Sequence, residues 1–278
     1  MSLRVWRVGR GLIVRRLLLG APTCLPEGPH LLPIRDDNPT RNRPVMTWLL
    51  LIALAVVWVL VQGAGVDPEA LAASVCNLGL VPGELTHRAA IGTGVQIGDG
   101  MACLVDADPI NLLTPLTSMF LHGGWLHLLG NALFLWIFGD NIEDSLGRSR
   151  FLIFYVLCGL AAAAAQIAIH PGSPVPMVGA SGAISGVLGA YLRLYPRARV
   201  QVLVFVFIIA VPAWLMLIYW FGLQLLEGLP QLKSLDPSIS SGTAVWAHVG
   251  GFVAGFILVG LFARPTMVER HRASALRR

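Results

Sequence analysis

The sequence has little charge for its length. Only 13% of its 278 residues are charged, whereas a soluble globular protein carries about 25%. This scarcity excludes a disordered chain, a nucleic-acid module and an ordinary cytosolic enzyme as first interpretations. Hydrophobic residues make up 55% of the chain, which indicates a polytopic membrane protein instead.

Motifs for metal binding and redox chemistry are also missing. The four cysteines form no CxxC pair, and there is no HExxH motif. His122 and His127 are five apart and have no neighbouring Glu, so a metalloprotease is disfavoured. We therefore expect neither a metal nor another cofactor. Cys76 and Cys103 share one predicted loop, where a disulfide is possible, but the sequence alone leaves the pairing open.

The chain contains several long apolar runs. A spanning helix needs about 20 mainly apolar residues. Six stretches qualify: residues 45–62, 119–141, 151–169, 177–194, 200–226 and 242–262. In the fifth stretch, Pro212 predicts a kink. The fold class is therefore an all-α membrane bundle of six helices.

Arginine is distributed unevenly along the chain. It is frequent before the first span, after the second and fourth spans and in the tail, and it is rare in the other connections. The positive-inside rule then places both termini in the cytoplasm. We expect a basic extension (1–44), a six-span domain (45–263) and a basic tail (264–278). Residues 1–29 are either a dispensable extension, which a start codon placed too early would add, or an amphipathic segment on the membrane surface.

Polar side chains inside the spans call for an explanation, because placing a polar group in hydrocarbon costs free energy. His127 and Asn131 lie on one face of the second span, Ser181 lies in the first turn or two of the fourth, and His248 lies about two turns into the sixth. In the predicted topology all four are about 5–15 Å below the outer surface. Interhelical hydrogen bonding could explain each one alone, but a common depth on three helices favours one shared site.

The fourth and sixth spans both carry small residues at four-residue spacing, which permits close approach of their backbones. The stripes are Ser181, Ser185 and Gly189, and Ala247, Gly251 and Gly255. A serine hydroxyl needs a base to become a nucleophile. We predict a Ser181–His248 dyad for acyl transfer, with His127, Asn131 and backbone amides near Gly179–Ser181 as oxyanion donors.

Three motifs carry a resemblance: HGGWLHLLGN (residues 122–131), GASGAISG (179–186) and AHVGGFVAG (247–255). With the six spans, they resemble the rhomboid intramembrane serine proteases of bacteria. The resemblance implies that Ser181 is the nucleophile, His248 the base, and His127, Asn131 and the Ser181 amide the oxyanion site. It also implies supporting roles for the remaining motif residues: Gly179 at the substrate, His122 before the oxyanion pair, Gly182 beside the serine, and Gly251 and Gly255 in helix packing.

The resemblance further implies what the protein acts on. Its substrates would be single-span membrane proteins cut near the outer face of the bilayer, and its other partners lipids rather than nucleic acid. The fifth span and the following loop would form a gate or cap. We expect a multi-pass protein of a bacterial plasma membrane.

Two departures from the family pattern concern residues around the site. Ser185 stands where several relatives have a Tyr packed under the catalytic His, which leaves open what orients His248. A Trp-Arg pair found in some first loops is also missing between residues 63 and 118.

Two other functions remain as alternatives. A transporter or channel is weakened by the lack of a repeat between the halves and by the near-surface depth of the polar residues. A catalytically inactive client-binding relative is disfavoured because Ser181 and His248 are both present.

Overall fold

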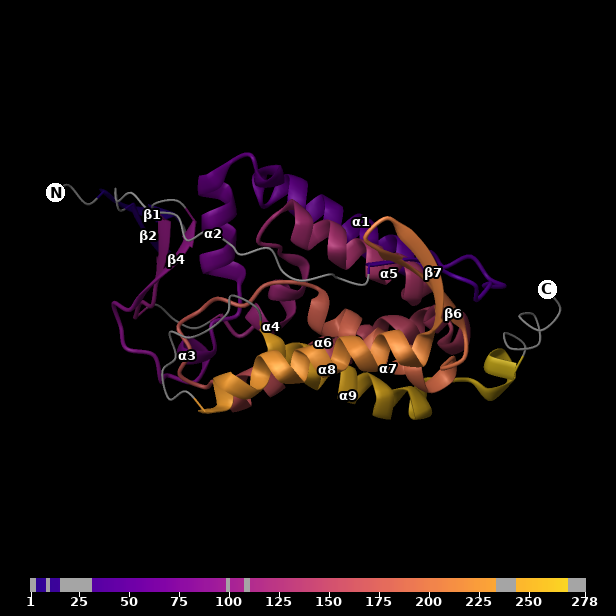
Figure 1. The fold of residues 1–278 in the computed structure, drawn as a ribbon. Helices are drawn as coiled ribbons and strands as arrows, with labels where there is room; N and C mark the ends of the chain where they lie inside the picture. Colours follow the sequence, from indigo (N-terminus) through magenta and orange to yellow (C-terminus); the bar gives the residue numbers. More distant parts are fainter. Residues whose placement is uncertain are drawn as a thin grey trace.

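The computed structural model of the chain describes residues 4–8, 11–15, 32–98, 101–107, 111–233 and 244–269. Helices dominate this part of the chain (Figure 1). The helices are α1 (Val45–Leu60), α2 (Pro68–Leu78), α3 (Pro82–Leu85), α4 (Thr114–Thr117), α5 (Trp125–Leu146), α6 (Arg148–Ile169), α7 (Ser181–Leu194), α8 (Ala213–Lys233) and α9 (Val245–Phe262). Short 3-10 turns, η1 (Gly63–Gly65) and η2 (Ser118–Phe120), follow α1 and α4.

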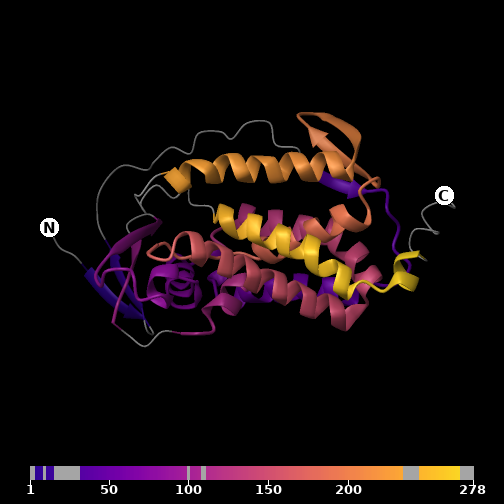
Figure 2. The ribbon, with the colours of Figure 1, turned by 90° about the horizontal axis from the view of Figure 1, so that it is seen from below.

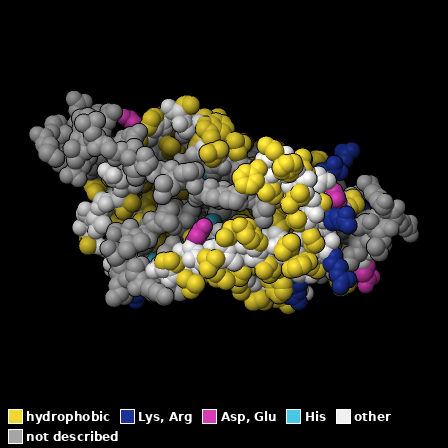
Figure 3. Space-filling view, in the orientation of Figure 1, with side chains coloured by type: hydrophobic (Ala, Val, Ile, Leu, Met, Phe, Trp, Pro, Cys, Tyr) yellow, Lys and Arg dark blue, Asp and Glu magenta, His cyan; other side chains and the backbone are white. Residues whose placement is uncertain are grey.

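The centre of the bundle is formed by α6, α7 and α9, which pack on one another. Helix α7 is the most enclosed of them, because every residue from Gly182 to Tyr191 is buried. Helix α1 packs against α5, and α8 lies at the edge of the bundle (Figure 2). Large apolar side chains remain exposed on α1, α5, α6, α8 and α9, and they cover much of the helical surface in Figure 3. Such surfaces are expected to face lipid.

Two described helices, α6 and α9, are long and apolar enough to cross a membrane by themselves. A third crossing is possible if Thr114–Phe120 and Trp125–Leu146, which are bent by 91° at residues 121–124, form one broken span. Helix α1 is apolar but shorter. The structure thus supports a helical membrane protein, and the count of six spans stays a prediction.

The predicted fifth span, 200–226, is wrong in its first half. Residues there form a hairpin of β6 (Arg199–Val204) and β7 (Phe207–Pro212), and α8 begins only at Ala213. Pro212 therefore ends a strand and kinks no helix, whereas Pro230 is the proline inside α8. In β6 the buried residues Val200 and Val202 alternate with less buried neighbours, as a strand requires, and β6 pairs with β3 (Leu32–Asp36).

The second predicted span, 119–141, also differs from the structure. Its first residues belong to η2 and to a bend, and α5 runs on to Leu146. The helix begins after Gly123 and Gly124, and it ends at Gly147, which has a φ of 81°. The polar residues between 140 and 145 remain helical because they hold neighbouring segments rather than facing lipid: Glu143 accepts hydrogen bonds from the amides of Met46 and Thr47 at the start of α1.

Strands occupy the two ends of the bundle (Figure 1). The sheet β3-β6-β7 lies at one end. At the other end, β1 (Arg4–Val8), β2 (Gly11–Arg15), β4 (Gly94–Gly98) and β5 (Met101–Leu104) form an antiparallel sheet in the order β1-β2-β5-β4. Within the described residues, β2 pairs with β5 and β3 pairs with β6, so residues 11–15 and 32–36 lie in different sheets at the two ends of the bundle. The rest of residues 1–29 lie outside the described residues.

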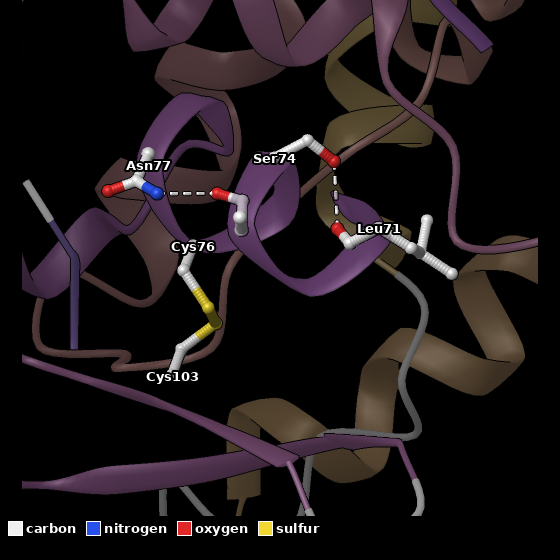
Figure 4. Close-up of a disulfide and its surroundings, with 6 residues drawn as sticks. Leu71, Ser74, Cys76, Asn77 and Cys103 are labelled. Carbon is white, nitrogen blue, oxygen red and sulfur yellow. Dashed lines mark hydrogen bonds between the residues drawn. A yellow bond between two sulfur atoms is a disulfide. The ribbon is translucent and has the colours of Figure 1, made fainter. Parts of the chain in front are cut away.

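Long-range contacts also join connections at each end of the bundle. At one end, the first long loop packs on the segment after α6: Gly83 N donates to Ser173 O at 2.8 Å, and Leu80 forms a β-bridge with Met177. A disulfide joins Cys76 of α2 to Cys103 of β5, with a Cα–Cα distance of 5.4 Å (Figure 4). At the opposite end, Arg264 N donates to Ser145 O, beside the start of α1.

Candidate active site

The hydroxyl of Ser181 and the imidazole of His248 are in direct contact. Ser181 is the first residue of α7, and His248 lies in the first turn of α9. The Ser181 Oγ and His248 Nε2 atoms are 2.8 Å apart. This distance is within the reach that a general base needs to take a proton from a hydroxyl.

The main chains of α7 and α9 hold these two side chains together. A Cβ at Gly251 would collide with the carbonyl oxygen of Gly182, and one at Gly255 would collide with that of Gly186. The helices can approach this closely only because those positions have no side chain. The predicted small-residue stripes therefore form a backbone-to-backbone seam, and the seam fixes the distance from Ser181 to His248.

His127, the third residue of α5, reaches the same place. Its Nδ1 accepts a hydrogen bond from Gly123 N at 3.3 Å, so in the neutral ring the hydrogen lies on Nε2. A Cβ at Gly179 would lie 2.7 Å from His127 Nε2 and 3.5 Å from Ser181 Oγ. Gly179 also has a φ of 129°, a backbone conformation that residues with a side chain rarely adopt. Glycine at this position thus leaves room for the imidazole beside the serine.

The amide of Gly179 is not a free donor. It donates to the carbonyl oxygen of Ser118 at 2.9 Å, so the structure does not support Gly179 itself as an oxyanion donor. Its contribution is the space it leaves for His127. The amides of the first turn of α7 remain, since a helix has no internal partners for them.

Asn131 lies one turn after His127 on α5 and is buried. Within the described residues, its Nδ2 has no hydrogen-bond partner. A buried amide without an acceptor costs free energy, so this donor can bond an acceptor that reaches it. This unsatisfied donor is on the helix face that carries His127.

His122 precedes α5 in the bend and is fully buried. Its main chain makes two hydrogen bonds of 2.8 Å with Gln62, one in each direction. Its ring meets the His127 ring edge-on, with centroids 5.1 Å apart. The His122 ring therefore packs against the His127 ring and supports its position. Gln62, which holds the main chain of His122, is a supporting residue that the sequence did not indicate.

A cavity of about 240 Å³ lies in front of the Ser181–His248 pair. His127, Ser181 and His248 all contribute to its wall. The rest of the wall is mostly small or flexible: Ala162, Ala163, Gly159, Gly182, Ala244, Ala247, Met119 and Met177. Three polar groups thus converge on one small, largely apolar space. Within the described residues, no group of three or more His, Cys, Asp or Glu could hold a metal ion.

The partner of the second His248 nitrogen is a residue that sequence reasoning missed. Gln224 of α8 places its Oε1 2.7 Å from His248 Nδ1. Ser185, which stands at the position of the family's Tyr, instead donates to the carbonyl oxygen of Ser181 at 2.7 Å. The only available signal was an amide inside an apolar stretch, and nothing in the sequence showed which way that amide faces.

The chain matches one protein-family model and several individual proteins. The Rhomboid domain family model matches residues 110–265, which is more than half of the chain. Rhomboid protease GluP of Bacillus subtilis (strain 168) is 32% identical over 152 residues, covering 54% of this chain and 26% of GluP. Rhomboid protein 1, mitochondrial, of Saccharomyces cerevisiae (strain ATCC 204508 / S288c) is 36% identical over 163 residues, covering 56% of this chain and 43% of that protein. RHOMBOID-like protein 5 of Arabidopsis thaliana is 32% identical over 150 residues, with coverages of 51% and 41%. The chain therefore spans less than half of the length of these relatives.

Proposed function

The chain belongs to the rhomboid family, and from this premise we propose that it is an intramembrane serine endopeptidase. The observation that carries the proposal is the 2.8 Å contact between Ser181 Oγ and His248 Nε2 at the wall of a small cavity. A hydroxyl against an imidazole is the arrangement that acyl transfer requires.

The reaction proceeds in two halves. His248 Nε2 takes the hydroxyl proton as Ser181 Oγ attacks the carbonyl carbon of the scissile peptide bond. His248 then gives that proton to the leaving amine, and an ester remains on Ser181. A water molecule, deprotonated by His248, attacks the ester, and the carboxylic acid product leaves with the serine restored.

The negative charge that forms on the carbonyl oxygen needs donors. We assign this role to the Ser181 amide, His127 Nε2–H and Asn131 Nδ2–H. The tautomer that Gly123 sets on His127 and the unpartnered Asn131 amide support the assignment. One such donor is worth about 3–4 kcal/mol of transition-state stabilisation. Gly179 leaves room for His127, Gly182 lets α7 approach Ala162 of α6, and Gly251 and Gly255 allow the contact between α7 and α9.

The proposed setting is a bundle of six crossings, in which α1, α5 with its bent leading segment, α6, α7, α8 and α9 span the membrane. The alternation of arginine-rich and arginine-poor connections supports a common side for the arginine-rich ones, and the hydrogen bond from Arg264 N to Ser145 O joins the start of the tail to the end of α5. The disulfide in the first loop suits an oxidising exterior. We propose a bacterial plasma membrane, with single-span membrane proteins as substrates and lipids as the remaining partners.

The test is cleavage of a model single-span protein in proteoliposomes. We expect wild-type protein to cut it and Ser181→Ala and His248→Ala each to lower the rate to background. Ser185→Ala is the matched control, since it removes a hydroxyl one turn further along the same helix and should keep most of the activity. Cleavage that survives Ser181→Ala would rule out the proposed chemistry.

A further inference from the structure

Gln224 links the edge helix of the bundle to the candidate base. Its half-buried side chain on α8 puts Oε1 2.7 Å from His248 Nδ1, while the other ring nitrogen lies 2.8 Å from Ser181 Oγ. Ser181, His248 and Gln224 thus form a continuous chain of contacts that starts on α7, crosses α9 and ends on α8.

The order of atoms in this chain decides where the imidazole hydrogen lies. An amide oxygen can only accept a hydrogen bond, so with Gln224 Oε1 facing Nδ1 the neutral His248 ring carries its hydrogen on Nδ1. The lone pair of Nε2 then faces the Ser181 hydroxyl, as a general base requires. The other tautomer would oppose two acceptors at Nδ1 and point an N–H at the serine, which would prevent proton removal.

The position of Gln224 depends on how α8 packs against α9. One turn before Gln224, the Trp220 ring lies 6.0 Å from the His248 ring, and Phe221 stacks on Phe252 with centroids 4.6 Å apart. One turn after Gln224, a Cβ at Gly228 would lie 3.0 Å from the Trp246 ring. These contacts run in opposite chain directions on the two helices. Gln224 is therefore held in the middle of an antiparallel seam.

We propose that Gln224 is a positioning residue, which fixes the tautomer and ring orientation of His248 and thereby makes the readiness of the base depend on the docking of α8. The inference rests on the proposed function. Gln224 then takes over the orientation of His248, which Ser185 does not provide, because the Ser185 hydroxyl donates to the Ser181 carbonyl oxygen and not to the imidazole. When α8 moves away from α9, His248 loses its Nδ1 acceptor.

The experiment compares three variants of the full-length protein in proteoliposomes. Gln224→Met keeps the length of the side chain but removes the acceptor, and we expect kcat to fall about 10- to 100-fold with little change in KM. Gln224→Glu keeps an acceptor and adds a charge, so it should be more active than the Met variant. Its acid limb should move to higher pH, because a carboxylate stabilises the protonated imidazole. The control is Glu227→Met, an exposed position on the same helix, which should behave as wild type.

The pH profile separates positioning from a merely structural role. His127 is the other titratable ring in the cavity wall and is unchanged in all variants, so a displaced acid limb in Gln224→Glu alone reports on His248. Gln224→Met with wild-type kcat would overturn the inference while leaving the proposed function standing. A Glu variant with the wild-type profile and the activity of the Met variant would also overturn it. Absence of cleavage by the wild-type protein would instead count against the proposed function.

Discussion

Helix α9 meets two of its neighbours, α7 and α8, in different ways. Toward α7 the contact is between main chains, since Gly251 and Gly255 lie against the carbonyl groups of Gly182 and Gly186. Toward α8 the contact is between side chains, through the stacked rings of Phe221 and Phe252 and the Gln224 amide. Side chains have alternative rotamers, whereas touching main chains have none. The α7–α9 seam is therefore the fixed part of the candidate site, and the α8–α9 seam is the part that can repack.

The largest expected effect comes from breaking the α7–α9 seam. Gly255→Val would drive a branched side chain into the Gly186 carbonyl group, and it should lower the free energy of unfolding by about 3 kcal/mol. Cleavage activity should be lost with it, because Ser181 and His248 separate. Unfolding in mixed micelles and cleavage of the model substrate measure the two effects.

Gly222→Val is the matched control for that substitution. Gly222 lies on α8, and a Cβ there would have nothing within 4 Å. The same chemical change should therefore leave stability close to wild type. Equal destabilisation by both substitutions would contradict the claim that the clash with the Gly186 carbonyl group causes the loss of stability.

A smaller effect is expected from loosening the α8–α9 seam. Phe221→Leu removes the stacked pair with Phe252 but keeps an apolar side chain, so the free energy of unfolding should fall by about 1 kcal/mol. The loss of kcat should exceed what that change in stability explains, since Gln224 is one turn away from the altered contact. If stability fell as far as in Gly255→Val and kcat per folded molecule stayed unchanged, the α8–α9 seam would be structural only.

The smallest effect concerns a region that belongs to neither seam. Glu84, on α3 in the first long loop, lines a separate cavity with Asp106, and burial together with that neighbouring charge raises its pKa to about 7. A raised carboxyl pKa means that the folded loop binds more protons than the unfolded one between about pH 4.5 and 7. Stability of this loop is therefore complete below that range and is lost as the pH rises through it.

Hydrogen exchange at pH 5 and pH 7.5 measures this dependence. We expect stronger protection around α3 at pH 5 after correction for intrinsic exchange, and Glu84→Gln should remove most of the difference. Amides of α7 and α9 should show no such change. A pH effect spread equally over the seams would mean that the first loop and the site are coupled, and would contradict their separation.

The difference between the two seams also explains what the sequence could predict. The α7–α9 contact could be predicted from a local pattern. The sequence has small residues at four-residue spacing beside Ser181 and His248, and this spacing is what the contact requires. Gln224 could not be placed, since its role depends on the rotation of α8 about its own axis. The β6–β7 hairpin could not be distinguished from a span, because an apolar, β-branched run suits both a strand and a membrane helix.

The bend before α5 escaped prediction for a related reason. Residues 119–124 continue an apolar stretch, and the turn there depends on distant partners: Gln62 holds the main chain of His122, and Ser118 O accepts from Gly179 N. Tertiary contacts of this kind leave no local pattern. The proximity of His127 to Ser181, in contrast, is what one shared site requires.

Labelling with an activity-based serine-hydrolase probe tests most directly whether His248 activates Ser181. We expect the probe to modify Ser181 in the membrane-inserted wild-type protein, as located by peptide mass analysis. His248→Ala should abolish the modification, and Glu227→Met should not. Modification at another residue, or undiminished labelling of Ser181 in His248→Ala, would show that the imidazole does not activate this hydroxyl.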